Sequence, residues 1–211
     1  VISTAHSATK YADNVLILPE FPLPVGVPDL TAVRLDEQAL AVRIASGVPP
    51  VLGRHRAAVL AKCGPTRPTS LITLSRTLGV SERQTRGLIG ELVRSGALTT
   101  EGTGWCRSSA VLPLGKVFSF EAKVSDWRSG FAQCLRYGLH ADNVTLILGR
   151  VGTKAARAAQ EACRAEGVGL VIEETRLVRS RSHTVPLARR LETSEHLLEL
   201  LVHQQTLRRP R

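Results

Sequence analysis

A carboxylate and an ammonium group lie two residues apart in Val117–Lys123, Val-Phe-Ser-Phe-Glu-Ala-Lys. Its aromatic and β-branched residues predict a short strand, whose side chains alternate between two faces. Phe118 and Phe120 would enter a core, and Glu121 and Lys123 would share the other face. A carboxylate can bind a divalent cation, and a neighbouring lysine can orient water or stabilise charge on a phosphate. The pair favours metal-dependent phosphodiester chemistry, and the competing interpretation is a solvated sheet edge.

The composition favours a polyanionic partner. Lysine and arginine number 28 against 18 acidic residues, which gives a net charge of +10, and the pI is near 10.3. Arginine far outnumbers lysine, which suits bidentate phosphate contacts. A genomic bias toward arginine codons is the alternative for that ratio, although it does not explain the net positive charge.

Several features indicate a cytoplasmic protein with a buried core and no membrane partner. Hydrophobic residues make up 43% of the chain, and no apolar run approaches the length of a membrane span. The start lacks a basic segment followed by an apolar one, and the four cysteines form no Cys-x-x-Cys pair, which favours free thiols in a reducing compartment. Methionine is absent even at position 1, so Val1 represents an alternative start codon or upstream residues are missing.

The N-terminal part predicts a β-hairpin followed by a linker. Val15–Leu18 and Asp29–Leu35 are apolar segments, and the turn between them contains Gly26 and Pro28. Residues 36–52 have a mixed composition and end in Ser-Gly-Val-Pro-Pro, which is typical of a linker.

Residues 53–109 have a helical period and then a hairpin pattern. Helices are expected over Arg54–Cys63, over Ser70–Leu78 and from Ser81 to Ser95, with Gln84 in capping-box position behind Ser81. Two short strands follow around a Glu-Gly-Thr-Gly turn. This order of helix, helix, tight turn, helix and hairpin resembles the winged helix-turn-helix family.

The winged-helix resemblance implies DNA binding. In that family the N-terminal residues of the helix after the turn enter the major groove, where arginine can read guanine and glutamine can read adenine. A residue near the wing tip can reach phosphate or the minor groove. The residues that the resemblance assigns to DNA here are Ser81, Arg83, Gln84, Arg86 and, in the wing, Arg107. The alternative is that the winged domain binds another protein or packs on its own chain.

The C-terminal half predicts an α/β layout. A helix from Asp126, a strand over Val144–Leu148, a helix over Thr153–Glu166 and a strand over Val168–Ile172 follow the Glu-x-Lys segment. Residues 173–186 are arginine-rich and expected to be irregular. The leucine-rich helix Ser194–Gln205 is too apolar to be exposed, so we expect it to pack on the α/β core or to form a homodimer contact.

Together these motifs resemble the PD-(D/E)XK, or restriction-endonuclease-like, nuclease superfamily. Its pattern is an acid after proline on one strand and Glu-x-Lys on the next core strand. The matching residues are Pro28-Asp29, Glu121-Ala122-Lys123, the upstream acid Glu20, and Gln133 with Tyr137 as the Gln-x-x-x-Tyr motif of the following helix. The resemblance covers residues 14–35 and 116–173.

The resemblance implies a mixed sheet flanked by helices and a metal site for Mg²⁺ or Mn²⁺. The metal ligands would be Asp29, Glu121 and the carbonyl of Ala122. Lys123 would orient water or stabilise the transition state, and Gln133 would position Lys123 or the phosphate. Glu20 would be a further acid.

One departure from the family pattern is large, because a long segment separates the two motif strands. We interpret it as a winged domain inserted at a hairpin tip. The expected division is a discontinuous nuclease-like domain of residues 1–35 and 116–211, a winged domain of residues 53–109, and linkers at 36–52 and 110–115.

The leading hypothesis is a metal-dependent DNA endonuclease that its winged domain recruits to duplex DNA. The alternatives are a DNA-binding regulator on an inactive nuclease scaffold, and an adaptor whose winged domain binds proteins. The recognition sequence, the preference for duplex or single strand, and nicking against double cutting remain open at this level.

Overall fold

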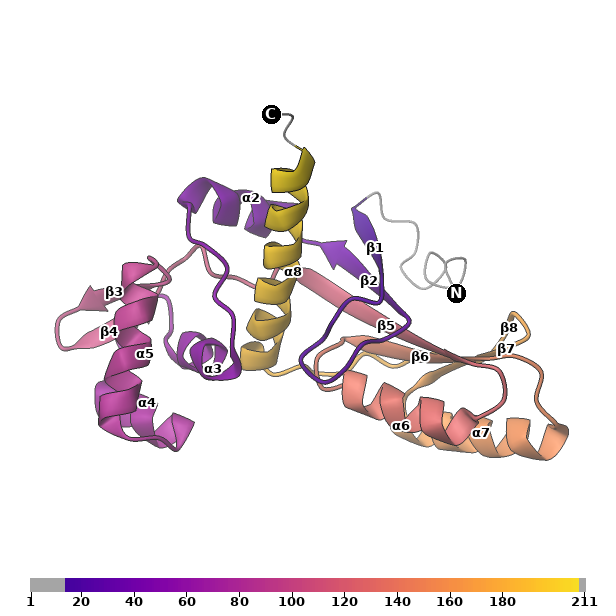
Figure 1. The fold of residues 1–211 in the computed structure, drawn as a ribbon. Coiled ribbons are helices and arrows are strands. Elements are labelled where there is room, and N and C mark those ends of the chain that lie inside the picture. The colour runs from indigo at the N-terminus through magenta and orange to yellow at the C-terminus, as the bar shows by residue number, and fades with distance from the viewer. Residues whose placement is uncertain (1–13, 209–211) are drawn as a thin grey trace. The chain divides into compact units, whose positions relative to one another are not determined.

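The computed structural model describes residues 14–208, with side chains as far as residue 203, and the chain forms two compact units (Figure 1). Unit 1 combines the chain up to Leu35 with Gly115–Val185, and unit 2 combines Asp36–Leu114 with the chain from Pro186. Each unit is therefore built from segments that are distant in the sequence.

Unit 1 is a mixed six-stranded sheet in the order β1-β2-β5-β6-β7-β8. The central strands β5, β6 and β7 are parallel, whereas β1, β2 and β8 pair antiparallel to their neighbours. The strands are β1 (Val15–Pro19), β2 (Leu30–Leu35), β5 (Gly115–Lys123), β6 (Asn143–Leu148), β7 (Gly169–Ile172) and β8 (Thr175–Val178). The expected α/β class with a mixed sheet is confirmed.

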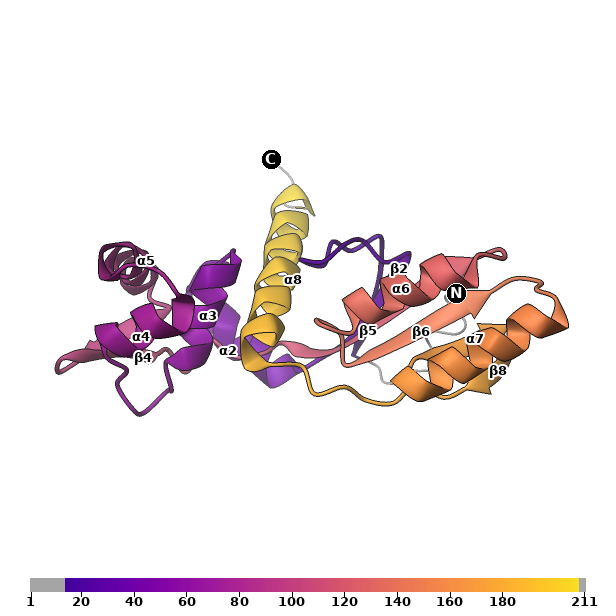
Figure 2. The same ribbon diagram turned by 90° about the horizontal axis from the view of Figure 1, so that it is seen from below.

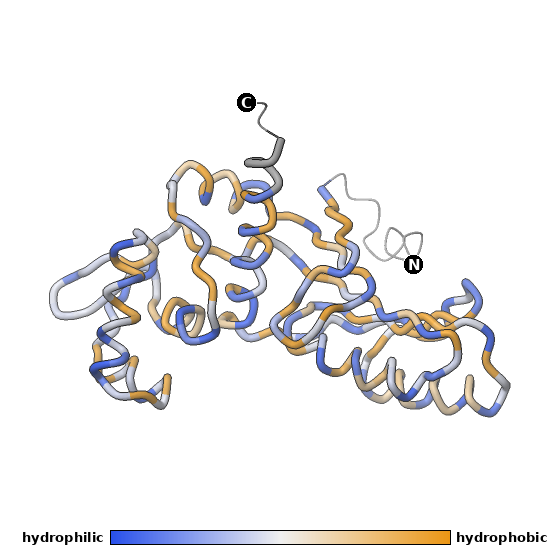
Figure 3. Tube along the Cα trace, viewed as in Figure 1, coloured by the Kyte–Doolittle hydropathy of each residue, from blue (hydrophilic) through white to orange (hydrophobic). Residues whose placement is uncertain are grey.

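Helices α6 (Trp127–Tyr137) and α7 (Thr153–Glu166) make the two crossovers between the parallel strands. They lie side by side along one face of the sheet (Figures 1 and 2). The strands under them are hydrophobic along most of their length, as short strands buried by crossover helices should be (Figure 3). Because α6 follows β5 directly, its first turn begins at the end of the Glu-x-Lys strand.

Side chains of β5 alternate between two faces as the sequence predicts, but the face that carries Glu121 is more buried than a solvated edge would be. Phe118 and Phe120 form an apolar cluster with Leu30 and Ala32 of β2, as predicted. Glu121, on the opposite face, is only 1% exposed. The interpretation as a solvated sheet edge is therefore wrong for Glu121, because α6 covers that face.

Strands β2 and β5 are neighbours, and residues 36–114 leave and return at their paired ends. Leu35 lies opposite Gly115 in the antiparallel register. Gly115 has φ 146°, and a Cβ atom there would overlap the carbonyl oxygen of Arg34, so only glycine fits this closely packed point.

Strand β8 is an element that the sequence did not predict, because residues 173–186 were expected to be irregular. It pairs with β7 through a tight turn in which Ile172 faces Thr175. The turn residues Glu173 and Glu174 both have positive φ, 45° and 68°. Such turns normally carry Asn-Gly or Gly-Gly, so the sequence lacks the usual signal.

Unit 2 contains five helices and a two-stranded hairpin among its described residues. They are α2 (Glu37–Ser46), α3 (Arg54–Lys62), α4 (Leu71–Leu78), α5 (Glu82–Arg94), β3 (Leu98–Glu101), β4 (Gly104–Arg107) and α8 (Leu187–Arg208). One apolar core joins α3, α4, α5 and the hairpin, and Leu191 of α8 belongs to it. The three helices and the hairpin expected between residues 53 and 109 are thus present.

Residues 36–52 are not a simple linker, because they contain α2. Asp36 caps this helix by accepting from the amide of Ala39, and Gly47 ends it in the left-handed conformation. Arg43 of α2 is buried and forms a 2.6 Å ion pair with Glu195 of α8. Glu195 also accepts from the amide of Val51, so this segment is part of the folded unit.

The C-terminal helix also differs from expectation. It begins at Leu187, and it packs against α3 in unit 2 instead of belonging to the α/β domain. Leu197 and Leu198 are 2% and 3% exposed and are buried within this chain, whereas Val202 near the end of the helix is 43% exposed. None of the helices in the described residues is long and apolar enough to cross a membrane.

Candidate active site and nucleic-acid interface

The two motif strands bring Asp29 and Glu121 to one place. Leu30 of β2 lies opposite Phe120 of β5, so the antiparallel register extended by one residue sets Asp29 opposite Glu121. The carboxylate of Asp29 accepts the amide of Ala122 at 2.7 Å. The Pro-Asp and Glu-x-Lys motifs therefore adjoin, despite the segment inserted between them.

The Glu121 carboxylate is buried, and its two oxygens differ in their hydrogen-bond partners. Its Oε1 lies 2.7 Å from Nζ of Lys123, and the Glu121 side chain is 2% exposed against 27% for Lys123. Its Oε2 is buried and has no hydrogen-bond partner. A buried charged oxygen without a partner is costly, so this oxygen is suited to a ligand that the chain itself does not provide.

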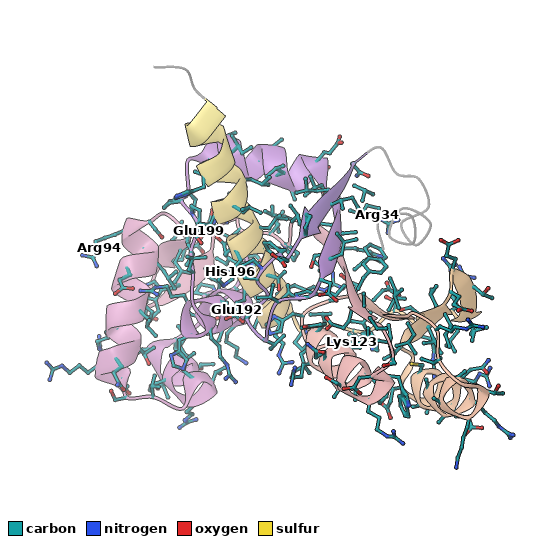
Figure 4. All side chains as sticks on the ribbon, turned by 45° about the vertical axis from the view of Figure 1, so that its right-hand side comes forward. Arg34, Arg94, Lys123, Glu192, His196 and Glu199 are labelled. Atoms are coloured by element: carbon teal, nitrogen blue, oxygen red, sulfur yellow. The ribbon has the colours of Figure 1, made fainter. Side chains whose placement is uncertain are left out.

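Lys123 is held as a cation at the end of β5, beside α6 (Figure 4). Its hydrogen bond to Glu121 raises its pKa, and the carboxylates of Asp29 and Asp126 add to this effect, while burial opposes it. Asp126 also caps α6 by accepting from the amide of Ser129. The ammonium thus stays charged at neutral pH and above.

Helix α6 approaches this strand end closely because of a glycine. A Cβ atom on Gly130 would lie 2.6 Å from Leu146 and 2.9 Å from Cγ of Lys123. Helix α6 also carries Gln133 and Tyr137 of the Gln-x-x-x-Tyr motif, and the Tyr137 side chain lies near both Gln133 and the Glu121 carboxylate. The Oε1 atom of Gln133 is a second buried oxygen without a partner.

Tyr137 fastens the chain that leads to Asp29. Its hydroxyl donates to the carbonyl of Val27 at 3.1 Å, two residues before Asp29, and Tyr137 is 2% exposed. Burial raises the pKa of this phenol to about 12, with the Glu121 carboxylate as a further cause. The tyrosine is therefore neutral at physiological pH, and its hydroxyl fastens the backbone two residues before Asp29.

Glu20 is adjacent to Asp29 through the backbone only. Its amide donates to the carbonyl of Asp29 at 3.3 Å, and its φ is 49°. The side chain is exposed, and no hydrogen bond or ion pair joins it to Glu121 or Lys123 in the described structure. Glu20 thus lies at the same end of the sheet without contributing a contact.

A buried carboxylate oxygen without a partner and an exposed carboxylate on the neighbouring strand fit a hard divalent cation. Among the described side chains, no group of three or more His, Cys, Asp or Glu could hold a metal ion. Mg²⁺ commonly binds one or two carboxylates together with water and substrate phosphate, whereas a structural zinc site needs four protein ligands. The donor set of Asp29 and the orphaned Oε2 of Glu121 fits the first kind of site, and Ala122 lies between them.

Sequence reasoning missed two hydroxyl groups on the same sheet face. Thr31 and Ser119 are register partners on β2 and β5, and the side-chain oxygen of each is buried without a partner. Each lies two residues from an acid, Thr31 from Asp29 and Ser119 from Glu121. The period of two along a strand could have placed them beside the carboxylates.

In unit 2, helix α5 presents two arginines to solvent after a tight turn. Helix α4 ends at Gly79, and Ser81 then caps α5. Arg83 and Arg86 are exposed in the first turns of α5. Arg86 lies 3.8 Å from Glu82 on the same helix, which is a weak exposed pair.

Ser81 and Gln84 have a structural role that competes with base reading. They form the expected capping box, in which Ser81 accepts from the amide of Gln84 and the Gln84 carbonyl oxygen accepts from Ser81. The side-chain NH₂ group of Gln84 would be the part left for a contact with another molecule. The sequence identified the capping box but also assigned the same side chains to DNA.

Arg107 lies inside unit 2 and not at the wing surface. It is 8% exposed, its Nη1 donates to the carbonyl of Leu60 at 3.4 Å, and burial lowers its pKa. Its place at the end of β4, paired with Leu98, turns the side chain toward α3. The expectation that Arg107 contacts DNA is therefore not supported by its position.

Comparison with protein-family models, with curated proteins and with solved structures found no match to this chain.

Proposed function

We propose that this chain is a metal-dependent DNA endonuclease whose active site is the strand end with Asp29, Glu121 and Lys123. The observation that carries the proposal is the buried Glu121 carboxylate, with one oxygen on Lys123 and the other without a partner. Asp29, from a distant part of the sequence, is hydrogen-bonded to the residue between them. A purely structural ion pair would not need an exposed second carboxylate at this point.

The residues divide the chemistry between them. Asp29 and Glu121, with the Ala122 carbonyl as a further ligand, would hold Mg²⁺ or Mn²⁺, which supplies charge neutralisation at the phosphate and a more acidic water. Gln133, whose side-chain carbonyl oxygen is buried without a partner, would orient Lys123 or the phosphate. Tyr137 keeps Asp29 in place through the Val27 carbonyl.

Lys123 acts as a fixed positive charge. Its ammonium lies 2.7 Å from the Glu121 carboxylate, which holds it at the end of β5. An ammonium that is partly exposed and held beside a carboxylate can instead stabilise charge that develops on the scissile phosphate. Its role is thus electrostatic and belongs to the reaction, not to the fold.

The resemblance to PD-(D/E)XK nucleases and to winged helix domains extends the proposal to the partner. Unit 2 has a helix–turn–helix arrangement of α4 and α5 followed by a β-hairpin, and Thr69 adds an isolated bridge to Trp105 of that hairpin. The exposed Arg83 and Arg86 would bind duplex DNA and recruit the nuclease. Four free, buried cysteines among the described residues agree with the proposed reducing, cytoplasmic setting.

The test is cleavage of plasmid, linear duplex and single-stranded DNA by the purified full chain with Mg²⁺, Mn²⁺ or chelator. We expect cleavage that requires the metal, and loss of cleavage in Asp29→Ala and Glu121→Gln. Raised Mn²⁺ should partly restore these two variants, because they weaken metal binding. Tight DNA binding without cleavage of any substrate in either metal would replace the proposal with a DNA-binding regulator on an inactive scaffold.

A further inference from the structure

A surface depression lies near the end of the candidate active strand and is not used by the chemistry above. Its volume is about 490 Å³, and Trp127, Arg128, Thr153 and Lys154 are among the residues that line it. It therefore lies between the start of α6 and the start of α7 in unit 1. Small-molecule sites have volumes of this order.

The wall of the depression combines an aromatic surface with positive charge. The guanidinium of Arg128 lies over the Trp127 ring, 4.8 Å from its centroid, and Phe131 packs against the same ring at 6.4 Å. No residue of the lining is acidic, whereas Arg128 and Lys154 are both exposed cations. Bases stack on aromatic rings and on guanidinium planes, and lysine binds phosphate.

The residues that line the depression are connected to the end of the Glu-x-Lys strand by short stretches of backbone. Trp127 follows Lys123 by four residues. Gly149, in the loop that leads to α7, donates its amide to the carbonyl of Lys123 at 2.9 Å. In parallel sheets, ligands bind beyond the carboxyl ends of the strands, where the loops after β5 and β6 meet here.

We propose that the Trp127–Arg128–Lys154 depression binds one unpaired nucleotide of a DNA strand, next to the phosphate that the active site would cleave. The base stacks on the Trp127 ring or on the guanidinium above it, and Lys154 binds the adjoining phosphate. A base inside a duplex is stacked on its neighbours, so its face is not available to the Trp127 ring. The inference rests on the proposed nuclease function and adds to it a preference for single-stranded or locally unpaired DNA.

The test measures binding without cleavage, in chelator, by the fluorescence of Trp127. The chain has two tryptophans, and Trp105 packs on the apolar core of unit 2, where phenylalanine can replace it. A Trp105→Phe variant thus leaves Trp127 as the only reporter. The probes are a short oligothymidylate, a blunt duplex of equal length, and inorganic phosphate.

We expect the oligothymidylate to quench Trp127, with little effect from the duplex or from phosphate. In the otherwise unaltered chain, Trp127→Ala should weaken binding of the oligothymidylate about tenfold, and Trp127→Phe should weaken it less, because an aromatic ring remains. Lys154→Gln should weaken it about threefold. The matched control is Lys116→Gln, an exposed lysine near the other end of β5, which should change nothing.

Equal quenching by duplex, quenching by phosphate alone, or unchanged affinity in either Trp127→Ala or Lys154→Gln would overturn the inference. Thermal unfolding shows whether each variant is folded. A loss of affinity in a folded variant is then due to the replaced side chain. Because the assay contains chelator, it is independent of the metal site. Quenching in a chain that cuts no substrate would retain the nucleotide site and reject the nuclease, and cleavage without quenching would do the reverse.

Discussion

Each unit of this chain buries a glutamate beside a basic residue, and the two pairs are completed in different ways. In unit 2, Glu195 and Arg43 lie 2.6 Å apart with side chains 2% and 1% exposed. Arg43 also donates to the carbonyls of Val48 and Pro49. In unit 1, Glu121 and Lys123 lie 2.7 Å apart, but one carboxylate oxygen has no partner and the lysine is 27% exposed.

The comparison separates a structural ion pair from a candidate functional one. The Arg43–Glu195 pair is closed, because the chain supplies partners for both members and solvent is excluded. The Glu121–Lys123 pair is open, because one carboxylate oxygen has no partner and the lysine is partly exposed to solvent. Burial with unused hydrogen-bonding capacity, rather than the presence of opposite charges, therefore points to ligand chemistry.

The largest expected effect on stability is at the closed pair. Arg43→Ala should lower the free energy of unfolding by about 3–5 kcal/mol, because Glu195 would remain buried without its counter-ion. Lys123→Ala should lower it less, since water can reach the position that the lysine occupies. Chemical denaturation of both variants measures the difference. Equal losses would mean that the two pairs are alike and that the Lys123 pair is structural.

The second effect is stabilisation by metal, which only the open pair should show. Mn²⁺ at one hundred times its dissociation constant should raise the free energy of unfolding by about 2.7 kcal/mol. Glu121→Gln should lose most of this gain, because the amide lacks the charge that binds the cation. Glu161→Gln, which removes an exposed carboxylate from α7, is the matched control and should keep it. If Mn²⁺ raised the free energy of unfolding of Glu121→Gln as much as that of the wild type, the metal would bind elsewhere.

The third effect is on DNA affinity and concerns the exposed arginines of unit 2. Unlike Glu121 of the open pair, these side chains are not buried. Replacing Arg83 or Arg86 with alanine should weaken duplex binding by about 1–3 kcal/mol each. Arg94→Ala, at the other end of α5, is the control and should have little effect (Figure 4). A salt titration of affinity gives the measurement. Equal losses at all three positions would indicate general charge attraction instead of a recognition helix.

The smallest effect is at Tyr137, which sharpens the account of the open pair. Tyr137→Phe removes the hydroxyl that holds Val27 and should lower the free energy of unfolding by about 0.5–1.5 kcal/mol. It should also weaken Mn²⁺ binding several-fold, because Asp29 lies two residues beyond the lost bond. Calorimetric titration separates the two consequences. Unchanged metal affinity would reduce Tyr137 to a packing residue.

Much of the fold followed from local patterns. The hairpin of β1 and β2, the helices α3 to α7 and the strands from β3 to β7 follow periodicity, caps and turn residues that lie close together in the sequence. The elements that the sequence did not predict depend on distant contacts or on unusual turns. Strand β8 follows two glutamates with positive φ, and α2 was obscured by the Pro-Pro cluster after it, although Asp36 and Gly47 are ordinary helix signals.

The site was predictable in its residue types but not in its burial. The resemblance to PD-(D/E)XK nucleases implied that Asp29, Glu121 and Lys123 belong together, and the register of β2 and β5 brings these residues to one place. The sequence could not show that α6 covers Glu121, because that depends on the close approach at Gly130. The same reason explains Arg107, whose exposure is set by packing against α3 and not by its place near a hairpin.

The rate of metal-dependent DNA cleavage by Lys123→Ala, beside its DNA affinity, tests the central claim most directly. The account predicts a loss of at least 10²-fold in cleavage, of the size found when one charge-stabilising group is removed from an active site, with DNA affinity nearly unchanged. Lys116→Ala, in the same strand, should cleave like the wild type. Cleavage by Lys123→Ala at the wild-type rate would contradict the account.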